Sequence, residues 1–399
     1  MKCIYCNEAG IFNGEHVFSA GLGGDDKRYM LHDAVCKTCN SEFAKLETEL
    51  LQKSPTALAR IAMQPGGRSR SGKRRDPTYT TDATYLVDES GRLLEAYISA
   101  GMVPVILPQI HIEGKSVGLT ATESEELKEF NSALQSLIGV GEFKLIVKMD
   151  SEGGVRYLVS TVSRRPEGYR IDDGVEVQKP PAEGLWLQVV KPDKKITHRF
   201  YRNKNGGLNY KTSQGDSLLE SLMTLEKYFA QYELPESFPV SMVEQPLMQV
   251  ESSPNMSMAD RVIAKIGVNF VAYLQGADYV RNPGFDEVKR SILYGDPKMP
   301  WTHSDDDHVS AILGRPPKGC HALMLGAMPN SNGQVTLSLV LKLYGSTVHR
   351  VKLADSVPSP GWDEPKFYLI NYVEHVIEPI SMLEYMRNYC EISQFLGQT

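Results

Sequence analysis

Two Cys-x-x-Cys pairs, Cys3/Cys6 and Cys36/Cys39, constrain the fold of this chain more than any other feature. They use four of the six cysteines in 399 residues. Four thiolates at these spacings suit a tetrahedral zinc ion, with each pair binding from one tight turn. Closing the tetrahedron ties residues 1–40 into one loop, in a module too small to have a secure core without the metal. The spacing predicts a structural zinc site with no open coordination position.

The overall composition is that of a soluble globular protein, with 41% hydrophobic and 23% charged residues. A formal net charge of -6 does not indicate a nucleic-acid-binding protein, although a local basic patch can still contact a phosphate backbone. The N-terminus lacks the apolar region of a secretory signal, and no run is long enough to span a membrane. We expect a cytoplasmic protein with reduced thiols and no membrane partner.

The most basic segment is QPGGRSRSGKRRDP, residues 64–77. Its Pro, Gly and Ser content predicts a loop, and its charge suits a phosphate-tracking role. The residues expected to contact nucleic acid are Arg68, Arg70, Lys73, Arg74 and Arg75. This segment also suggests the domain boundaries: a first module over residues 1–62, a basic linker over 63–82, and a larger domain over 83–399 with a sub-boundary near 250.

The rest of the chain alternates between strand and helix patterns and predicts an α+β fold. Two hairpins are expected over residues 84–99 and 143–163. Apolar residues at helical spacing predict helices over 122–138, 217–234, 258–276 and 285–295, followed by strands over 321–328, 334–345, 346–354 and 367–373 and a closing helix near 377–391. Within the first module, Ser41 is a suitable N-cap for a helix that continues to residue 63.

The stretch GEHVFSAGLGG, residues 14–24, lies between the two cysteine pairs. Together, CIYC, this loop and CKTCN leading into a helix resemble the zinc-stapled, treble-clef ββα-metal nucleases of the HNH endonuclease family. The resemblance covers about the first 55 residues. The segment AKIGVNFVAYLQGADYVRNPGFDEVKRSILYG also resembles the region found downstream of such modules, through Phe285, Asp286, Arg290, Leu293 and Gly295.

The resemblance implies a role for each of these positions. His16 would be the general base that deprotonates the water attacking a phosphodiester, a task that suits a neutral imidazole. Glu15 would be a ligand of a catalytic Mg²⁺ or Mn²⁺ ion, which prefers oxygen ligands and neutralises charge on the phosphate. Asn40 would brace the loop and orient His16. A second ligand would come from the helix, where Glu47 is preferred over Glu49.

Two departures from the family pattern bear on these roles. The family's proline near the exit of the loop is Ser19 here, and its final histidine or asparagine is absent, so that only a glutamate is available in its place. Carboxylates are acceptable Mg²⁺ ligands, so this change leaves activity open but also leaves the identity of the second ligand open.

Together these features predict a metal-dependent endonuclease that hydrolyses DNA, with RNA as an alternative substrate. The resemblance suggests phage defence or restriction as the setting. One rival is a zinc-dependent nucleic-acid-binding regulator that does not cut. Another is a latent nuclease that a small molecule or protein partner switches on through the C-terminal domain. The oligomeric state stays open.

Overall fold

The structure is a computed structural model. It describes residues 1–25, 27–66, 69–70, 73–74, 76–114, 116–151, 154–190, 198–213, 217–233, 238–240, 245–299 and 311–390. By contact, the chain divides into two compact units. Unit 1 contains residues 1–81, 99–102 and 252–399, and unit 2 contains residues 82–98 and 103–251. The segment 1–62 thus shares a unit with the C-terminal third of the chain, while the module boundaries at 62 and 83 stay predictions. The expected mixed α+β class is confirmed.

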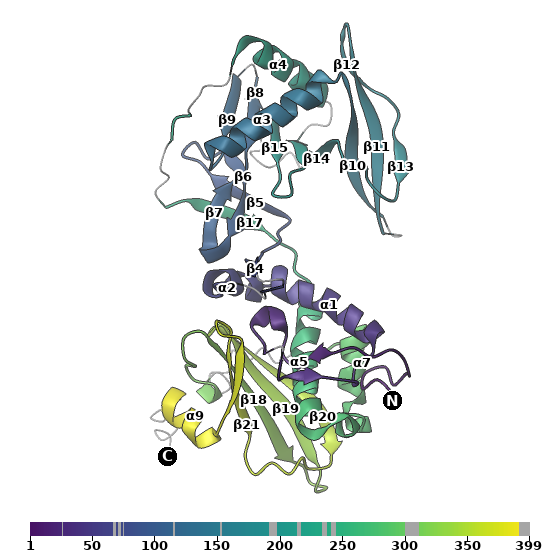
Figure 1. Cartoon of the computed structure of the whole chain (residues 1–399), viewed down its shortest axis with the longest axis vertical. Coiled ribbons are helices and arrows are strands. Elements are labelled where there is room, and N and C mark those ends of the chain that lie inside the picture. The colour runs from purple at the N-terminus through teal and green to yellow at the C-terminus, as the bar shows by residue number, and fades with distance from the viewer. Residues whose placement is uncertain are drawn as a thin grey trace. The chain divides into compact units, whose positions relative to one another are not determined.

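The N-terminal part of unit 1 is two short strands followed by two helices (Figure 1). Its elements are β1 (Glu15–His16), η1 (Ala20–Leu22), β2 (Met30–Leu31), α1 (Lys37–Gln52), α2 (Pro55–Met63), β3 (Ser69–Arg70), β4 (Lys73–Arg74) and η2 (Ala100–Met102). Strands β1 and β2 are antiparallel, and β3 pairs with β4.

The start of α1 differs from the sequence prediction, in which Ser41 caps the helix. The N-cap is Cys36, whose sulfur accepts a hydrogen bond from the backbone N–H of Cys39. Ser41 is the fifth residue of the helix, one turn after its start, and its hydroxyl donates to the carbonyl of Lys37. The second cysteine pair therefore sets the helix start as well as supplying thiolates, because a cysteine sulfur here takes the place of the usual side-chain oxygen.

The C-terminal part of unit 1 is an antiparallel sheet covered by helices on both faces. Its elements are α5 (Met256–Gln275), α6 (Ala277–Val280), η3 (Pro283–Phe285), α7 (Asp286–Tyr294), β18 (Cys320–Pro329), β19 (Val335–Leu343), β20 (Thr347–Val357), β21 (Lys366–Asn371), β22 (Val376–Ile380) and α9 (Met382–Tyr389). The strand order is β20-β19-β18-β21-β22. Residue Pro379 lies in β22, an edge strand, where a missing N–H is tolerated. Because Val376–Ile380 form β22, the closing helix α9 begins at Met382, later than the expected residue 377.

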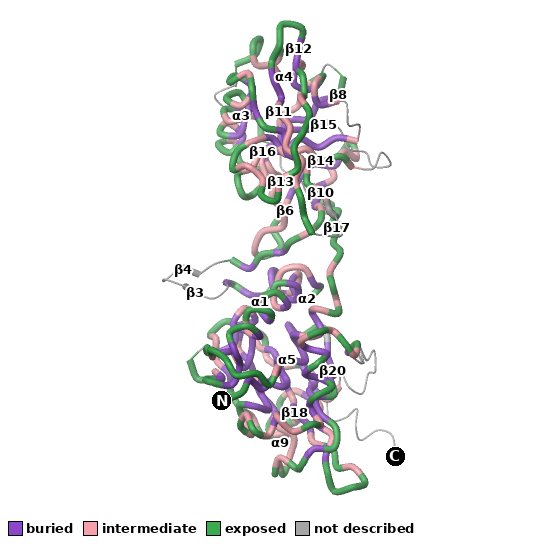
Figure 2. The backbone as a smooth tube through the Cα atoms, turned by 90° about the vertical axis from the view of Figure 1, so that its right-hand side faces the viewer, coloured by how far each residue is buried: buried purple, intermediate pink, exposed green. Residues whose placement is uncertain are grey.

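Helix α5 is the centre of unit 1. It contacts α1 on one side and β19 and β20 on the other, and nearly every residue from Ala259 to Ala272 is buried (Figure 2). Because α5 packs against other elements on both sides, it joins the N-terminal segment and the sheet in one hydrophobic core. None of the described helices is long and apolar enough to cross a membrane.

The described residues of unit 2 form a four-stranded sheet, a nine-stranded sheet and two helices. Its strands are β5 (Ala83–Val87), β6 (Leu93–Ser99), β7 (Val103–Ile106), β8 (Gln109–Glu113), β9 (Ser116–Thr120), β10 (Glu142–Ser151), β11 (Gly154–Arg165), β12 (Gly168–Ile171), β13 (Val175–Val177), β14 (Leu185–Val189), β15 (His198–Arg202), β16 (Leu208–Thr212) and β17 (Leu247–Glu251). Helices α3 (Ser124–Gly139) and α4 (Ser217–Gln231) share a core with the larger sheet. Both expected hairpins, β5–β6 and β10–β11, are confirmed.

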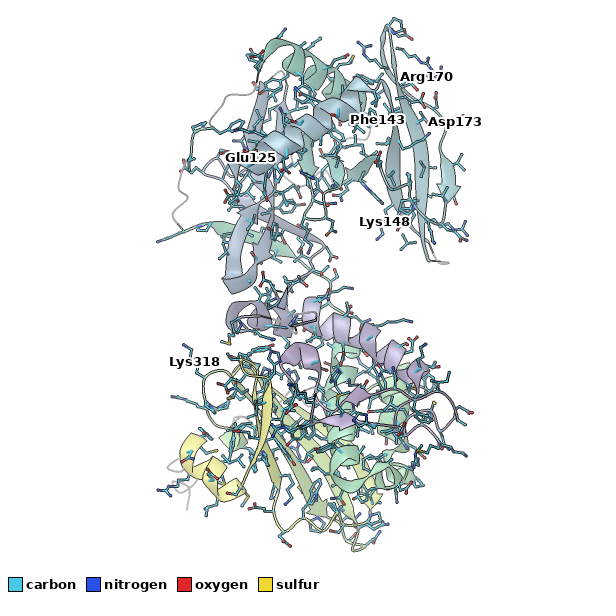
Figure 3. All side chains as sticks on the ribbon, in the orientation of Figure 1. Glu125, Phe143, Lys148, Arg170, Asp173 and Lys318 are labelled. Carbon is cyan, nitrogen blue, oxygen red and sulfur yellow. The ribbon has the colours of Figure 1, made fainter. Side chains whose placement is uncertain are left out.

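The strands of unit 2 follow the alternation expected for a half-buried sheet. On β10, Phe143 is buried in the core with α3 and α4, whereas Lys148 is exposed (Figure 3). A buried ion cluster lies at β6, β15 and β16, where Glu95 pairs with Lys211 at 2.7 Å and with Arg199 at 3.5 Å. These charges are almost fully buried and compensate one another, as buried charges must.

The loop over residues 14–24, which lies between the two cysteine pairs and is called the framed loop below, contains glycines that allow its backbone to pass close to other elements. Gly23 has φ +85°, and a Cβ there would stand 2.4 Å from the Cα of Tyr372. A Cβ on Gly24 would stand 2.3 Å from the carbonyl oxygen of Phe18. Neither neighbour is a flexible side-chain end, so only glycine fits. The loop is therefore shaped to lie against the sheet of unit 1.

His321 on β18 fastens this loop from the sheet side. Its Nδ1 accepts from the backbone N–H of Tyr344, so the proton is on Nε2, which donates to the carbonyl of Leu22 at 3.0 Å. Burial lowers the pKa of His321 to about 3. The ring is thus held neutral, and both of its nitrogens are used.

We expect Gly23→Ala to destabilise unit 1 by about 3 kcal/mol or more, since it combines a left-handed backbone with a backbone clash. Gly333→Ala is the matched control, because Gly333 has φ +73° and nothing lies within 4 Å of the place that its new methyl group would take. That control should cost only about 1 kcal/mol. Hydrogen exchange on peptides of unit 1 measures both, and equal losses would contradict the close approach.

Stability should fall as pH drops below about 6.5, the ordinary histidine value. In that range the unfolded chain takes a proton on His321 and the folded chain does not, so unfolding is favoured until pH reaches about 3. Between pH 7 and pH 5 this residue should remove roughly 2 kcal/mol. Denaturant unfolding of wild type and His321→Gln tests this, because the variant should lose less stability over that range. If the two proteins lose the same free energy of unfolding between pH 7 and pH 5, His321 is not the group responsible.

Candidate functional site

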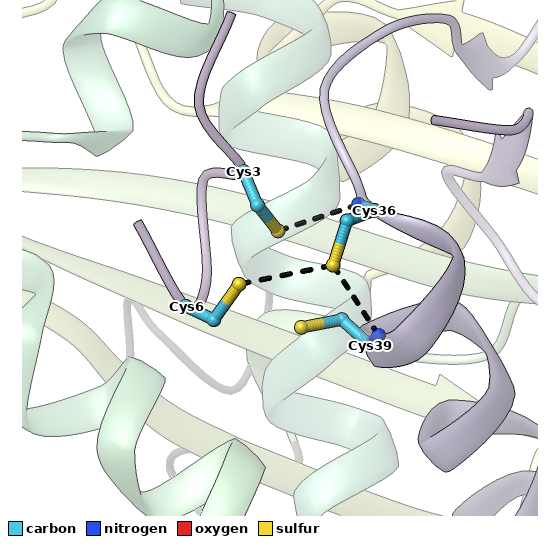
Figure 4. A group of neighbouring side chains, drawn as sticks. All are labelled: Cys3, Cys6, Cys36 and Cys39. Carbon is cyan, nitrogen blue, oxygen red and sulfur yellow. Dashed lines mark hydrogen bonds between the residues drawn. The ribbon is translucent and has the colours of Figure 1, made fainter. Parts of the chain in front are cut away.

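The four cysteines of the two pairs gather at the start of α1 (Figure 4). Their sulfur atoms all lie within 4.8 Å of one another, and the Cys6 and Cys36 sulfurs are 3.7 Å apart. Zinc–sulfur bonds of about 2.3 Å place the sulfurs of a tetrahedral site about 3.8 Å apart. The backbone N–H of Cys36 also points to the sulfur of Cys3, at 3.4 Å. This donor set and spacing are compatible with structural zinc.

Two backbone contacts bring the pairs together. Ile4 donates its N–H to the carbonyl of Ala34, and Phe12 forms an isolated bridge with Cys36. The six cysteines form no disulfide. In the described part of the chain, this is the one group of three or more His, Cys, Asp or Glu ligand atoms gathered this closely.

Glu15 is buried on β1 and faces a lysine that the sequence analysis did not single out. Its Oε1 lies 2.6 Å from the Nζ of Lys265, which projects from α5. The same oxygen accepts from the side-chain amide of Asn269, one helical turn further along α5, at 3.3 Å. Burial raises the pKa of Glu15 although Lys265 acts in the opposite direction.

Glu47 on α1 meets the same lysine from the other side. Its Oε1 lies 2.8 Å from Lys265 Nζ and accepts from the hydroxyl of Ser19 at 2.5 Å. Burial works to raise the pKa of Glu47, but Lys265, Ser19 and the nearby His16 outweigh it and hold the pKa below its ordinary value. Ser19, which departs from the proline of the family pattern, is therefore a hydrogen-bond donor to this carboxylate.

Lys265 is almost fully buried between these carboxylates, with its side chain 1% exposed. Burial works to lower its pKa, but Glu47 and Glu15 together raise it above the ordinary lysine value. The ammonium also lies 5.5 Å from the centre of the Phe43 ring, a cation–π contact. We refer to Glu15, Glu47 and Lys265 as the carboxylate–lysine centre.

Asn269 and Tyr5 fix the surroundings of this centre. The Asn269 amide donates to the carbonyl of His16 at 2.9 Å, and its Oδ1 accepts from the Tyr5 hydroxyl at 2.7 Å. Tyr5 lies inside the first cysteine pair. The hydrogen bonds therefore run from the cysteine cluster through α5 to the backbone of His16.

The structure brings most of the expected catalytic residues together. Glu15 and Glu47 both bind Lys265, and His16 lies near Glu47 and accepts from Asn269 at its backbone carbonyl. Asn40 donates to the carbonyl of Gly14 at 3.2 Å, which fastens the loop just before Glu15. Glu49 lies elsewhere: it accepts from the N–H of Asn255 at the start of α5 and pairs with Lys53 at 2.9 Å.

Three of the basic residues expected to contact nucleic acid lie on short paired strands, Arg70 on β3 and Lys73 and Arg74 on β4. Their side chains lie outside what the structure describes, and Arg68 and Arg75 lie outside the described residues.

A groove of about 680 Å³ opens beside the cysteine cluster. Ile11, Lys37 and Tyr294 are among its lining residues, and Ile11 and Tyr294 are largely exposed. Its lining does not include Glu15, His16 or Glu47, so the groove is separate from the carboxylate–lysine centre.

Sequence reasoning missed Lys265, Asn269 and Tyr5. A signal was present, because Lys265 and Asn269 are four residues apart within the apolar run AKIGVNFVAYL. Polar residues at helical spacing in a helix that is otherwise buried must find polar partners, which marks them as candidates for a buried site.

No family model, curated protein or solved structure shows a significant match to this chain.

The cysteine cluster leads to a prediction about metal removal. Purified protein should contain one zinc per chain, and Cys36→Ser should lose it, because that cysteine would be a zinc ligand and is the N-cap of α1. Cys320→Ser is the control, since Cys320 lies on β18 outside the cluster. Metal analysis and hydrogen exchange on peptides of residues 1–52 check this. Zinc retained by Cys36→Ser would contradict the four-cysteine site.

Proposed function

We propose that the chain is an endonuclease that hydrolyses phosphodiester bonds of DNA, with His16 as the general base. The observation that carries this proposal is the gathering of Glu15, His16 and Glu47 at the junction of β1 and α1, beside a four-cysteine cluster. The order of two short strands and a helix, and the loop GEHVFSAGLGG between the cysteine pairs, support the resemblance to HNH endonucleases.

A catalytic Mg²⁺ or Mn²⁺ ion held by Glu15 and Glu47 does not fit this arrangement. Such an ion sits about 2.0–2.1 Å from carboxylate oxygens. The Oε1 atoms of both glutamates already face the Lys265 ammonium, at 2.6 and 2.8 Å. An ion bridging these oxygens would contact the ammonium and be repelled by it.

The chemistry assigned to the residues is general-base hydrolysis. Neutral His16 takes a proton from water as the water oxygen bonds to phosphorus, while the P–O bond to the leaving sugar breaks and that oxygen takes a proton from solvent. The nearby Glu47 carboxylate, which Lys265 and Ser19 keep ionised, stabilises the imidazolium that forms. Asn40 and Asn269 hold the backbone on either side of Glu15.

The substrate follows from the resemblance and from the basic segment. Arg68, Arg70, Lys73, Arg74 and Arg75 would neutralise phosphates, and their contribution to binding would weaken as salt rises. The chain as a whole is acidic, so this local segment is where a phosphate backbone would be held.

A second candidate is a zinc-dependent DNA-binding regulator that does not cut. The buried ammonium between Glu15 and Glu47 favours it, because a carboxylate pair already neutralised lacks the metal on which related nucleases would rely. A latent nuclease that a trigger activates through the rest of the chain would show the same arrangement before activation.

Supercoiled plasmid incubated with the purified protein tests the proposal, both with Mg²⁺ and in buffer freed of divalent ions on a chelating resin. Wild type should nick or linearise it, and His16→Ala should lose at least about 100-fold in rate. His32→Ala is the control, since His32 is an exposed histidine of the same segment. Cutting that survives in His16→Ala would place the active site elsewhere, and binding without cutting in every sample would favour the regulator.

A further inference from the structure

The carboxylate–lysine centre has the form of a cation site whose cation belongs to the protein. Two glutamates from segments far apart in sequence, on β1 and α1, direct one oxygen each at a single point. The Lys265 Nζ stands at that point, 2.6 Å from Glu15 and 2.8 Å from Glu47. Both distances are those of strong charge-assisted hydrogen bonds.

Lys265 has no free path out of this position. Its side chain is 1% exposed, and α5 is buried between α1 and the sheet of unit 1. Its own carbonyl accepts from the Tyr5 hydroxyl at 3.4 Å, and Asn269 binds Glu15 from the next turn. The lysine thus projects from a rigid helix whose flanking contacts are already made.

The partners of the ammonium account for its charge. Two carboxylates accept its hydrogen bonds, and the face of Phe43 lies beside it. Removal of the ammonium would leave two carboxylates facing each other in a buried space, an arrangement that requires another cation or a proton.

We propose that Lys265 is the resident cation of the Glu15–Glu47 pair and that the pair does not bind a divalent metal ion while Lys265 is present. In the proposed hydrolysis Lys265 is a positioning residue, because it acts through Glu47, whose carboxylate it holds at 2.8 Å. This inference concerns metal binding, so it holds or fails independently of whether the chain cuts DNA.

A direct corollary is that removing the lysine creates a metal site. Without the ammonium, Glu15 and Glu47 offer two buried carboxylate oxygens to a hard cation. The variant Lys265→Ala should therefore gain what the wild type lacks.

Manganese titration followed by electron paramagnetic resonance tests this on the full-length, zinc-loaded protein without nucleic acid. Wild type should bind no Mn²⁺ below millimolar concentrations. Lys265→Ala should bind one Mn²⁺ per chain at least 100-fold more tightly, and the double variant Lys265→Ala, Glu47→Gln should lose that site. Lys289→Ala is the matched control, because Lys289 is another buried lysine but has a single carboxylate partner, Asp286. It should gain nothing.

If Lys265→Ala does not fold, the Mn²⁺ titration of the wild type still tests the proposal. One Mn²⁺ bound by wild type and lost in Glu47→Gln would overturn the proposal, as would a folded Lys265→Ala that binds no Mn²⁺. Wild type that binds none, together with Lys265→Ala that folds only when Mn²⁺ is added, would support it. Because no cleavage is measured, failure of the plasmid assay cannot be mistaken for failure of this inference.

Discussion

The ammonium of Lys265, buried between the carboxylates of Glu15 and Glu47, is the contact on which the rest of unit 1 depends. It joins three segments that are separate in sequence: the framed loop, helix α1 and helix α5. Each group alone would be costly to bury, and together they compensate one another. The geometry of His16 follows, because its backbone is held by Asn269 from the same helix.

The loop over residues 14–24 needs the cysteine cluster because it packs against the sheet through close backbone contacts. The backbone of the loop passes so close to Tyr372 at Gly23, and to Phe18 at Gly24, that a side chain at either glycine would collide with its neighbour. Its side chains Val17, Phe18 and Leu22 are buried in the shared core of unit 1, so the loop is stable only when it is held against the rest of that unit. The cysteine cluster holds its ends, and His321 holds Leu22 from the sheet.

The parts of the fold that sequence could predict are those that rest on local patterns. The gathering of four cysteines, the mixed α+β class and both hairpins follow from spacing, periodicity and turn residues, and all are confirmed. The capping role expected for Ser41 was wrong because Cys36 supplies the cap from outside the apolar pattern. Zinc occupancy, the roles of His16 and Asn40, and DNA cleavage stay predictions.

The missed residues are those whose partners lie far away along the chain. Lys265 is 250 residues from Glu15, and no local rule pairs a lysine in an apolar helix with a glutamate on a distant loop. Sequence spacing places Glu47 and Glu49 on different faces of one helix, but it does not say which face meets which part of α5. The packing of α5 brings Glu47 to Lys265 and leaves Glu49 at the start of α5 with Asn255.

Anomalous X-ray diffraction from crystals of the wild-type protein soaked in Mn²⁺ would show directly whether an ammonium or a metal ion lies between Glu15 and Glu47. We expect an anomalous peak at the four cysteines, at the zinc edge, and a lysine ammonium without any manganese signal between Glu15 and Glu47. A manganese peak bound to both carboxylates, with Lys265 displaced, would contradict it.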